Sequence, residues 1–370
     1  MYKFTFAPDI GTAGYINVDM SIRYSRDQGY GFQGGGQDTH SLLPHAHTGE
    51  YFHEPVPTFV CDVPNGTYRV IVELGDDCIG SETTVKASFG RLMLYKICTL
   101  PGELISEQFA IQVTNGQLTL AFGGARPKVQ SFQIVKDSAI ARVFLAGDST
   151  VADRPSGRYP LSGWGQVIPK FFTGEIAVVN EASSGRSSKS FISEGRLHAI
   201  RDRIRPGDYL FVQFGHNDEK TDERGTEPYS SFQEYLTAFI EAARQKGARP
   251  ILISPVHRRS FGEDGKIRDT HGHYVEAVRE LAFKTKTSYL DLASTSKTLF
   301  NDLGEERTKA IFMWAEPNRY RAYPDGIQDD THFQEYGAIQ VADLVAGCIR
   351  TSDLIELKSR LRGNCDCPIA

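Results

Sequence analysis

Polar and apolar positions alternate through the first part of the chain. Strand-like segments span residues 68–74, 83–89, 107–113, 117–122 and 129–135, each bounded by Gly, Asn, Asp or Pro. Such alternation is typical of strands with one buried face and one solvated face. Asn65-Gly66 and Asn115-Gly116 are hairpin-type turn signals because both residue types tolerate a positive φ. Many short strands with hardly any helical pattern predict an all-β sandwich.

From Ala141 onward the pattern changes to short apolar runs without alternation. These runs span residues 143–146, 177–180, 209–214, 251–254 and 289–292. Parallel strands that are covered on both faces have this pattern. Between them lie helical segments, of which 231–246 carries one apolar stripe before Gly247. We therefore predict a β-sandwich over residues 1–138 and, over 139–370, an α/β domain with an open parallel sheet.

Length and composition agree with a globular protein of two domains, since 370 residues are too many for one small core. The sequence has no apolar run of about 18 residues, so it predicts no membrane span. The N-terminus lacks the apolar segment of a signal peptide, which predicts a cytoplasmic chain, although a trimmed secreted protein would look the same. The net charge of −5, without a basic stripe, argues against a nucleic-acid partner. Nothing in the sequence indicates the oligomeric state.

Four polar blocks follow the apolar runs or precede a late helix. They are Gly147-Asp148-Ser149-Thr150, residues 180–187 with Gly185, Gly215-His216-Asn217-Asp218, and Asp329-Asp330-Thr331-His332. Open α/β sheets bind their ligands beyond the carboxyl ends of the strands. We therefore expect all four blocks to meet at one end of the sheet.

These blocks contain the groups that a serine hydrolase needs. The hydroxyl of Ser149 requires a base, and His332 can accept its proton near neutral pH. Asp329, three residues before His332, can turn back from the same loop to orient the imidazole. Suitable donors for a developing oxyanion are the backbone N–H groups of Ser149 and Gly185 and the side-chain amide of Asn217.

The order of these blocks resembles that of the SGNH, or GDSL-like, hydrolases. Gly-Asp-Ser-Thr in the first block, together with Ser162-Gly-Trp-Gly165, Ser184-Gly-Arg-Ser187 and residues 214–218, is similar to the rhamnogalacturonan acetylesterase branch. The resemblance covers residues 142 to about 350. It implies a flavodoxin-like three-layer α/β/α domain and Ser149, Asp329 and His332 as catalytic residues. It also implies an oxyanion hole of Ser149, Gly185 and Asn217, no cofactor, no metal, and deacetylation of a pectic polysaccharide. Residues 1–137 look like a galactose-binding-type, jelly-roll-like sandwich, chiefly through residues 29–32.

Other residues have competing interpretations. Trp164, Arg186, His216 and Arg258 are candidate substrate-binding residues, the arginines because a galacturonate polymer needs local positive charge. The alternatives are a buried core position for Trp164, a packing role for His216, and solvated loop charges for the arginines. Asp330 competes with Asp329, and we expect it to be a solvated neighbour.

Three short pairs resemble metal ligands: His45 with His47, His271 with His273, and Cys365 with Cys367. None has an evident third ligand, so the sequence predicts no metal site.

The expected function is hydrolysis of acetyl esters on a carbohydrate, with rhamnogalacturonan as the expected substrate, through an acetyl-Ser149 intermediate. The alternatives are an esterase acting on other acetylated sugars such as xylan or on short acyl esters, and a carbohydrate-binding protein with weak catalysis. For the sandwich, Tyr24, Tyr30, Phe32 and Tyr51 either form an exposed sugar-binding surface or are buried in a structural module. We slightly favour the structural role.

Overall fold

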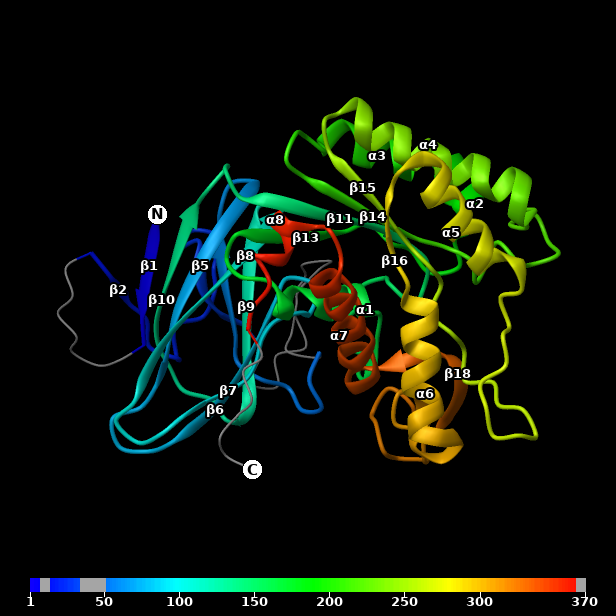
Figure 1. The fold of residues 1–370 in the computed structure, drawn as a ribbon. Coiled ribbons are helices and arrows are strands. Elements are labelled where there is room, and N and C mark those ends of the chain that lie inside the picture. The colour runs from blue at the N-terminus through cyan, green and yellow to red at the C-terminus, as the bar shows by residue number, and fades with distance from the viewer. Residues whose placement is uncertain (7–13, 34–50, 364–370) are drawn as a thin grey trace.

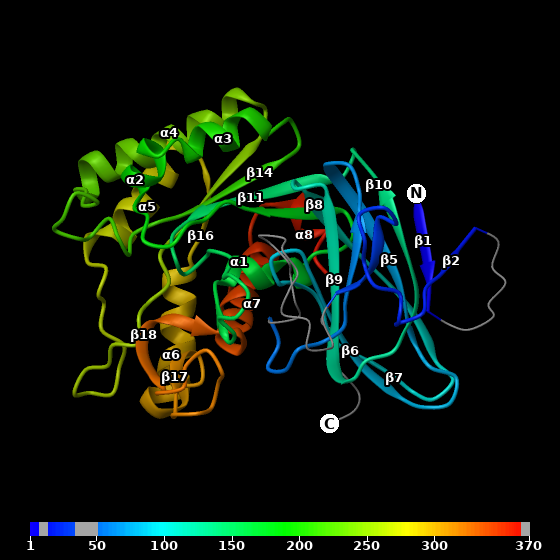
Figure 2. The same ribbon diagram turned by 180° about the vertical axis from the view of Figure 1, so that it is seen from behind.

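A computed structural model describes residues 1–6, 14–33 and 51–363. The two halves of the chain lie side by side, with the sandwich in blue to cyan and the α/β part in green to red (Figure 1; from behind, Figure 2). Within the described residues, no helix has the length and apolar character needed to cross a membrane. The predicted His45/His47 and Cys365/Cys367 pairs fall outside the described residues.

The N-terminal half is a sandwich of two five-stranded layers, as expected. One layer has the order β8-β5-β10-β1-β2 and the other β3-β4-β9-β6-β7. The strands are β1 (Tyr2–Thr5), β2 (Ile16–Asn17), β3 (Tyr30–Gln33), β4 (Thr58–Asp62), β5 (Gly66–Gly75), β6 (Ser81–Ala87), β7 (Arg91–Thr99), β8 (Leu104–Val113), β9 (Gln117–Arg126) and β10 (Val129–Lys136).

Aromatic rings from both layers fill the sandwich core. The ring centroids of Phe4, Phe59 and Phe132 lie 4.9 to 5.2 Å from one another. Phe32 is buried and packs edge-on against Phe59 at 5.4 Å. The hydroxyl of Tyr24 donates to the carboxylate of Asp62 at 3.0 Å. These contacts place two of the four candidate aromatics in the internal structure of the sandwich.

The two Asn-Gly signals mark turns, but they do not form hairpins. Asn65-Gly66 links β4 to β5 and Asn115-Gly116 links β8 to β9, and in each case the two strands belong to different layers. Gly116 has a φ of +79°, as such a turn requires. The two turns bond to each other, since the N–H of Gly116 donates to Asn65 Oδ1 at 2.8 Å. Local turn chemistry was predicted correctly, whereas strand pairing depended on contacts between the layers.

The C-terminal half is a parallel sheet between two helical layers. Its strands have the order β16-β15-β14-β11-β13, which places the first strand between the second and the third, as in flavodoxin-like folds. The strands are β11 (Ala141–Gly147), β13 (Ile176–Asn180), β14 (Tyr209–Gln213), β15 (Arg249–Ile253) and β16 (Ser288–Leu290). A separate three-stranded sheet contains β12 (Leu161–Ser162), β18 (Ile327–Gln334) and β17 (Phe312–Ala315).

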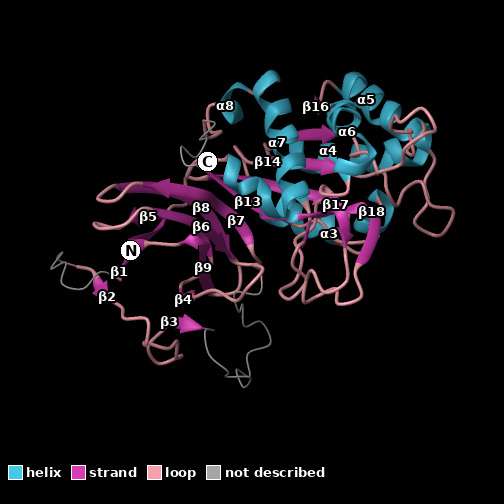
Figure 3. Cartoon of the chain, turned by 90° about the horizontal axis from the view of Figure 1, so that it is seen from below, coloured by secondary structure: helices cyan, strands magenta, loops and turns pink. Residues whose placement is uncertain are grey.

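Helices cover both faces of the parallel sheet (Figure 3). One layer contains α2 (Ser188–Ser193), α3 (Arg196–Arg203), α4 (Gln233–Gln245) and α5 (His273–Thr285), and the other contains α1 (Trp164–Val167), α6 (Leu292–Thr308) and α7 (Glu335–Thr351). Three short helices complete the chain: the 3-10 turn η1 (Ile168–Phe171), the π turn η2 (Pro228–Phe232) and α8 (Ile355–Lys358). On β11, Val143 and Leu145 face one core while Phe144 and Ala146 face the other. Burial on both faces explains the unbroken apolar runs.

The two halves share a sheet, which the sequence did not predict. Strand β8 of the sandwich pairs in parallel with β13 of the α/β half, with Ala110 opposite Ala177 and Ile111 opposite Val178. The result is one sheet of ten strands. The predicted boundary after residue 138 lies in the link between β10 and β11 and stays a prediction.

Candidate active site

Ser149, His332 and Asp329 form a hydrogen-bonded chain at the carboxyl end of β11. His332 Nε2 lies 2.8 Å from Ser149 Oγ, and His332 Nδ1 lies 2.7 Å from Asp329 Oδ2. Burial disfavours ionisation of Asp329, but hydrogen bonds from the His332 side chain and from the backbone N–H groups of Thr331 and His332 outweigh it and lower its pKa to about 2. The carboxylate is therefore ionised at neutral pH and holds Nδ1 protonated, which leaves Nε2 free to accept the serine proton.

An irregular strand brings Asp329 and His332 to the same side. Both belong to β18, where the sequence had suggested a loop. Side chains three positions apart on a regular strand point to opposite faces. Opposite β18, however, Phe312 pairs with Phe333 while the next residue, Met313, pairs with Asp329, so residues 330–332 bulge out of the ladder. A bulge redirects side chains in this way.

The candidate oxyanion donors lie around the same serine. Neither the backbone N–H of Ser149 nor that of Gly185 has an acceptor within the described part of the chain. Gly185 has a φ of +80°, a conformation that favours glycine. Asn217 Nδ2 donates one N–H to the carbonyl of Arg186 at 3.1 Å. Because an amide nitrogen carries two N–H groups, the second remains available to a substrate oxygen.

A cavity of about 480 Å³ opens over these groups. We call it the serine cavity, and its lining residues are Ser149, Arg154, Arg158, Leu161, Ser184, Gly185, Asn217, Tyr323, Ile327, Asp329 and His332. It brings Ser149, His332 and the three candidate oxyanion donors into one space, which is the arrangement that acyl transfer to a serine requires.

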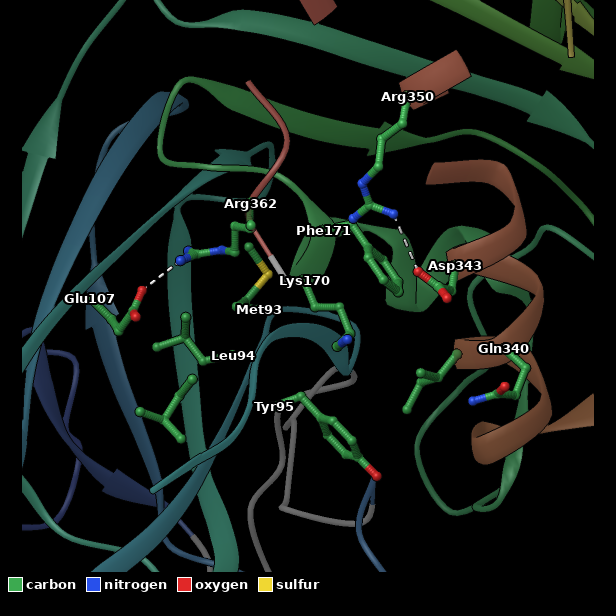
Figure 4. Close-up of a pocket in the computed structure, with 13 residues that line it drawn as sticks. Met93, Leu94, Tyr95, Glu107, Lys170, Phe171, Gln340, Asp343, Arg350 and Arg362 are labelled. Carbon is green, nitrogen blue, oxygen red and sulfur yellow. Dashed lines mark hydrogen bonds and ion pairs between the residues drawn. The ribbon is translucent and has the colours of Figure 1, made fainter. Parts of the chain in front are cut away.

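Another cavity, of about 330 Å³, lies between β7 and α7 and has a different character. Figure 4 shows two ion pairs among its lining residues, and the distances are 2.5 Å for Arg362 with Glu107 and 3.6 Å for Arg350 with Asp343. Neither a serine nor a histidine is among the described residues that line it. We therefore place the chemistry in the serine cavity.

Residues 145–338 match the GDSL-like lipase/acylhydrolase family, and residues 2–133 match the family described as beta-agarase/YXIM esterase-like, galactose-binding domain-like. The chain belongs to the GDSL-like lipase/acylhydrolase family. As a member of this family it is a carboxylic ester hydrolase, and its N-terminal half is a galactose-binding-like domain.

Two relatives and one crystal structure show how far the similarity extends. The chain is 49% identical over 205 residues to the rhamnogalacturonan acetylesterase RhgT of Bacillus subtilis. The aligned region covers 55% of this chain and 88% of RhgT. The chain is 32% identical over 348 residues to the uncharacterized esterase YxiM of the same organism, which covers 86% of this chain and 87% of YxiM. The YxiM crystal structure matches 94% of this chain and 98% of its own, with 28% identity and a TM-score of 0.53. The similarity to YxiM therefore includes both halves.

The prediction that Trp164 binds substrate is wrong. Trp164 has no exposed surface, and its Nε1 donates to Gln213 Oε1 at 2.9 Å. Gln213 in turn donates to Thr150 Oγ1 at 2.8 Å, and Thr150 donates to Asp148 Oδ1 at 2.8 Å. This buried chain of hydrogen bonds holds the loop that carries the GDSL-like serine.

His216 and Arg258 also lie away from the serine cavity. The His216 side chain is 3% exposed, and its Nδ1 is 3.3 Å from Asp148 Oδ2. Arg258 forms an ion pair with Glu219 at 2.5 Å and donates to the carbonyl of His216 at 3.3 Å. Because His216 is buried behind the third block, its predicted contact with substrate is wrong. Arg258 contacts the same block with a side chain that is 17% exposed, and its contact with substrate stays a prediction.

The backbone carbonyl of Arg186, and not its guanidinium group, takes part in the hydrogen bonding around the serine cavity. Its guanidinium pairs with Glu194 at 3.0 Å and does not line the serine cavity. Its carbonyl accepts the hydrogen bond that orients Asn217. The Arg186 side chain is 36% exposed, and its contact with substrate outside the serine cavity stays a prediction.

Sequence reasoning missed Arg154, Arg158 and Tyr323, which line the serine cavity. Arg154 is buried, which lowers its pKa to about 10, and it donates to the carbonyl of Ser149 and to Ser184 Oγ. It therefore ties the first block to the second. The only sequence signal was its position five residues after Ser149, in a segment that contains a second arginine.

The remaining His pair does not form a metal site. His271 is buried between Glu219 and the carbonyl of Val256, at 2.9 Å from each, while His273 begins α5 and contacts Tyr229. Among the described residues, no group of three or more His, Cys, Asp or Glu side chains is arranged to hold a metal ion.

Proposed function

We propose that this family member is a carbohydrate acetylesterase in which Ser149 is the nucleophile, His332 the general base and Asp329 its orienting acid. The observation that carries the proposal is the contact of 2.8 Å between His332 Nε2 and Ser149 Oγ, continued to Asp329 at 2.7 Å. This geometry matches the serine, histidine and aspartate arrangement used for acyl transfer.

The reaction follows from the positions of these groups. His332 Nε2 accepts the hydroxyl proton while Ser149 Oγ attacks the acetyl carbonyl carbon. The carbonyl oxygen becomes negative and receives hydrogen bonds from the N–H groups of Ser149 and Gly185 and from Asn217 Nδ2. His332 then returns the proton to the sugar oxygen as the C–O bond breaks. Water, activated by the same histidine, attacks the acetyl-serine and releases acetate.

The substrate class rests on the relatives and on the charge of the cavity. RhgT, at 49% identity, is a rhamnogalacturonan acetylesterase by name. The net charge of this chain is −5, yet both charged side chains of the serine cavity besides the triad, Arg154 and Arg158, are basic. A basic lining in an acidic protein favours an anionic polymer such as a galacturonate-containing chain.

Acetate release from acetylated rhamnogalacturonan, xylan and mannan, with p-nitrophenyl acetate as a general ester control, tests this proposal. We expect the highest kcat/KM on rhamnogalacturonan and loss of activity on every ester in Ser149→Ala. Equal rates on all three polymers would contradict the substrate class. Undiminished activity of Ser149→Ala would contradict the mechanism.

A further inference from the structure

A third cavity, of about 530 Å³, lies where the sandwich meets the α/β half. We call it the junction cavity. The sandwich contributes residues 52–55 to its lining, and the α/β half contributes Gly157, Tyr159 and residues 318–322. RhgT, at 88% coverage, matches only 55% of this chain, so the sandwich side of this cavity is a feature that a single catalytic module does not supply.

The junction cavity adjoins the serine cavity because the same two loops line both. Arg158 and Tyr323 line the serine cavity, whereas their chain neighbours Tyr159 and Ala322 line the junction cavity. The Arg158 guanidinium lies 5.7 Å from the ring centroid of Tyr323, so the two loops meet side by side. Tyr320 of the same loop donates its hydroxyl to Gln334 Oε1 at 3.1 Å, two residues beyond His332. The two cavities are therefore neighbours along the surface formed by these two loops.

Three aromatic side chains from three segments form the wall of the junction cavity. The ring centroids of His53, Tyr159 and Tyr320 lie 5.9 to 6.4 Å apart, with interplanar angles of 60° to 82°. Edge-to-face contacts of this kind fix the rings relative to one another. The partly negative face of an aromatic ring attracts the slightly positive C–H groups on one face of a pyranose. The wall is thus suited to a sugar ring.

A buried lysine holds the sandwich side of this wall in place. Lys86 on β6 is 1% exposed and pairs with Glu335, the first residue of α7. Its Nζ also donates to the carbonyl of Tyr51 at 2.6 Å and lies 4.3 Å from the ring centroid of Phe52. An unpaired buried charge would be costly, so this lysine links the segment at 51–52 firmly to the α/β half.

The charge of the junction cavity favours an anion. Arg319 and Arg321 are exposed, and neither has a carboxylate within 4.0 Å among the ion pairs of the described residues. The acidic side chain in the lining is Glu54, which is 81% exposed and lies 3.9 Å from His53 Nε2. Among the described residues of the lining, two guanidinium groups and one carboxylate leave a net positive charge, and guanidinium binds carboxylate through paired hydrogen bonds.

We propose that the junction cavity binds a uronate residue of the substrate chain, next to the acetylated sugar in the serine cavity. The inference rests on the proposed function, because it extends the binding site of the same substrate. It assigns the N-terminal domain a direct part in recognition: His53 contacts the sugar ring, while Arg319 and Arg321 bind its carboxylate.

Calorimetric titration of the intact protein with a deacetylated galacturonate-containing oligosaccharide tests this site independently of ester hydrolysis. The double variant Arg319→Gln/Arg321→Gln should bind at least about tenfold more weakly, because charge-assisted hydrogen bonds are lost. Arg279→Gln is the matched control, since that arginine is exposed on α5 and pairs only with Glu276 there. It should bind like the wild type. Circular dichroism of each variant reports whether the fold is intact.

A neutral xylo-oligosaccharide separates charge recognition from general sugar binding. Its affinity should change by less than about threefold in the double variant, since it offers no carboxylate to guanidinium. Glu54→Gln should strengthen binding of the acidic oligosaccharide. Equal affinity of wild type and double variant for the acidic oligosaccharide would overturn the proposal, and so would failure of the wild type to bind it. Failure of the wild type to release acetate from the acetylated polymer would instead refute the proposed function.

Discussion

Two aspartate–histidine pairs flank Ser149, and they differ in depth. In the first, Asp329 and His332 lie 2.7 Å apart with side chains 30% and 29% exposed. In the second, Asp148 and His216 lie 3.3 Å apart with side chains 0% and 3% exposed. The residues of the buried pair adjoin Ser149 and Asn217 in sequence, so sequence proximity alone would have favoured them as catalytic partners.

The burial of the two pairs and their geometry relative to Ser149 indicate different roles. His332 reaches the serine hydroxyl and borders the cavity, so it can pass protons between serine, substrate and water. Neither ring nitrogen of His216 has a hydrogen-bond partner within the described part of the chain. Burial lowers the pKa of His216 to about 4, which keeps it neutral at pH 7. The exposed pair is suited to proton transfer, and the buried pair to support of the two loops that it joins.

The largest difference in turnover is expected between variants of the two histidines, His332 and His216. His332→Ala removes the base, and loss of one such residue from a serine triad costs roughly a millionfold in turnover. His216→Gln should lose far less, roughly a hundredfold at most, because the triad itself stays complete. Turnover of p-nitrophenyl acetate by both purified variants measures the contrast. Comparable losses would contradict the division of roles.

The next contrast lies within the fourth block. Asp329→Asn should lower turnover by about four orders of magnitude, because the amide no longer holds His332 in the required tautomer. Asp330→Asn should stay within roughly tenfold. Its carboxylate accepts hydrogen bonds from Arg259 at 3.1 Å and Trp314 at 2.8 Å, and no hydrogen bond joins it to His332 among the described residues. Steady-state kinetics on both variants checks this, and a greater loss in Asp330→Asn would show that the wrong carboxylate was chosen.

A smaller effect is expected at Asn217, which adjoins the buried pair but faces the cavity. Asn217→Ala should lower kcat by roughly 10² to 10³, the usual cost of one oxyanion donor. KM should change little, since the hydrogen bond strengthens as charge develops on the oxygen. Separate determination of kcat and KM decides the point. An increase in KM at constant kcat would mean that Asn217 binds the ground state.

The smallest effect concerns stability and pH. Burial lowers the pKa of His216 from 6.5 to about 4, so between these values the unfolded chain binds a proton that the folded chain does not. Through His216, the free energy of unfolding should therefore fall as the pH drops through this window, by about 1.4 kcal/mol per unit of pKa difference at most. Asp218, whose pKa burial raises to about 7, contributes in the opposite direction over the same window in both wild type and variant. The free energy of unfolding can be measured by urea denaturation at several pH values from 7 to 4.5. It should depend less steeply on pH in His216→Gln than in wild type.

Other titratable groups also affect how the free energy of unfolding depends on pH, each in a direction set by its pKa shift. His257, whose pKa burial also lowers to about 4, should leave a residual slope in His216→Gln. Asp329, whose pKa lies near 2, contributes stability above its ordinary value of 3.8 that is lost only as the pH falls toward 2. It therefore adds nothing to the slope above pH 4.5. If the free energy of unfolding depended equally on pH in His216→Gln and wild type, the claim that His216 is buried and neutral would be contradicted.

Elements with a strong local pattern were predictable from the sequence. Alternation located five of the ten sandwich strands, β5, β6, β8, β9 and β10, and apolar runs located all five strands of the parallel sheet, because each pattern reflects burial on one face or on two. The polar blocks followed these strands, so the approach of Ser149, Asn217 and His332 was expected. Hydrophobic periodicity and the position of a residue at the end of a strand depend on the local sequence, so both can be read from the sequence and are found again in the structure.

Features that depend on contacts between distant segments were not predictable. The parallel pairing of β8 with β13 joins residues 110 and 177 across the two halves. The bulge in β18 depends on its register with β17, which gives no signal in the sequence of residues 327–334. Trp164 and His216 do not line the serine cavity, whereas Arg154 and Arg158 do, and side-chain chemistry alone suggested the opposite for the first two.

The central claim is that Ser149 is activated by His332 and not by the buried histidine beside it. Labelling with a serine-reactive organophosphonate, read by intact mass and peptide mapping, tests it most directly. We predict one adduct per chain on Ser149, formed in wild type and in His216→Gln and abolished in His332→Ala. An adduct on another residue, or equal labelling of Ser149 in His332→Ala, would contradict the account.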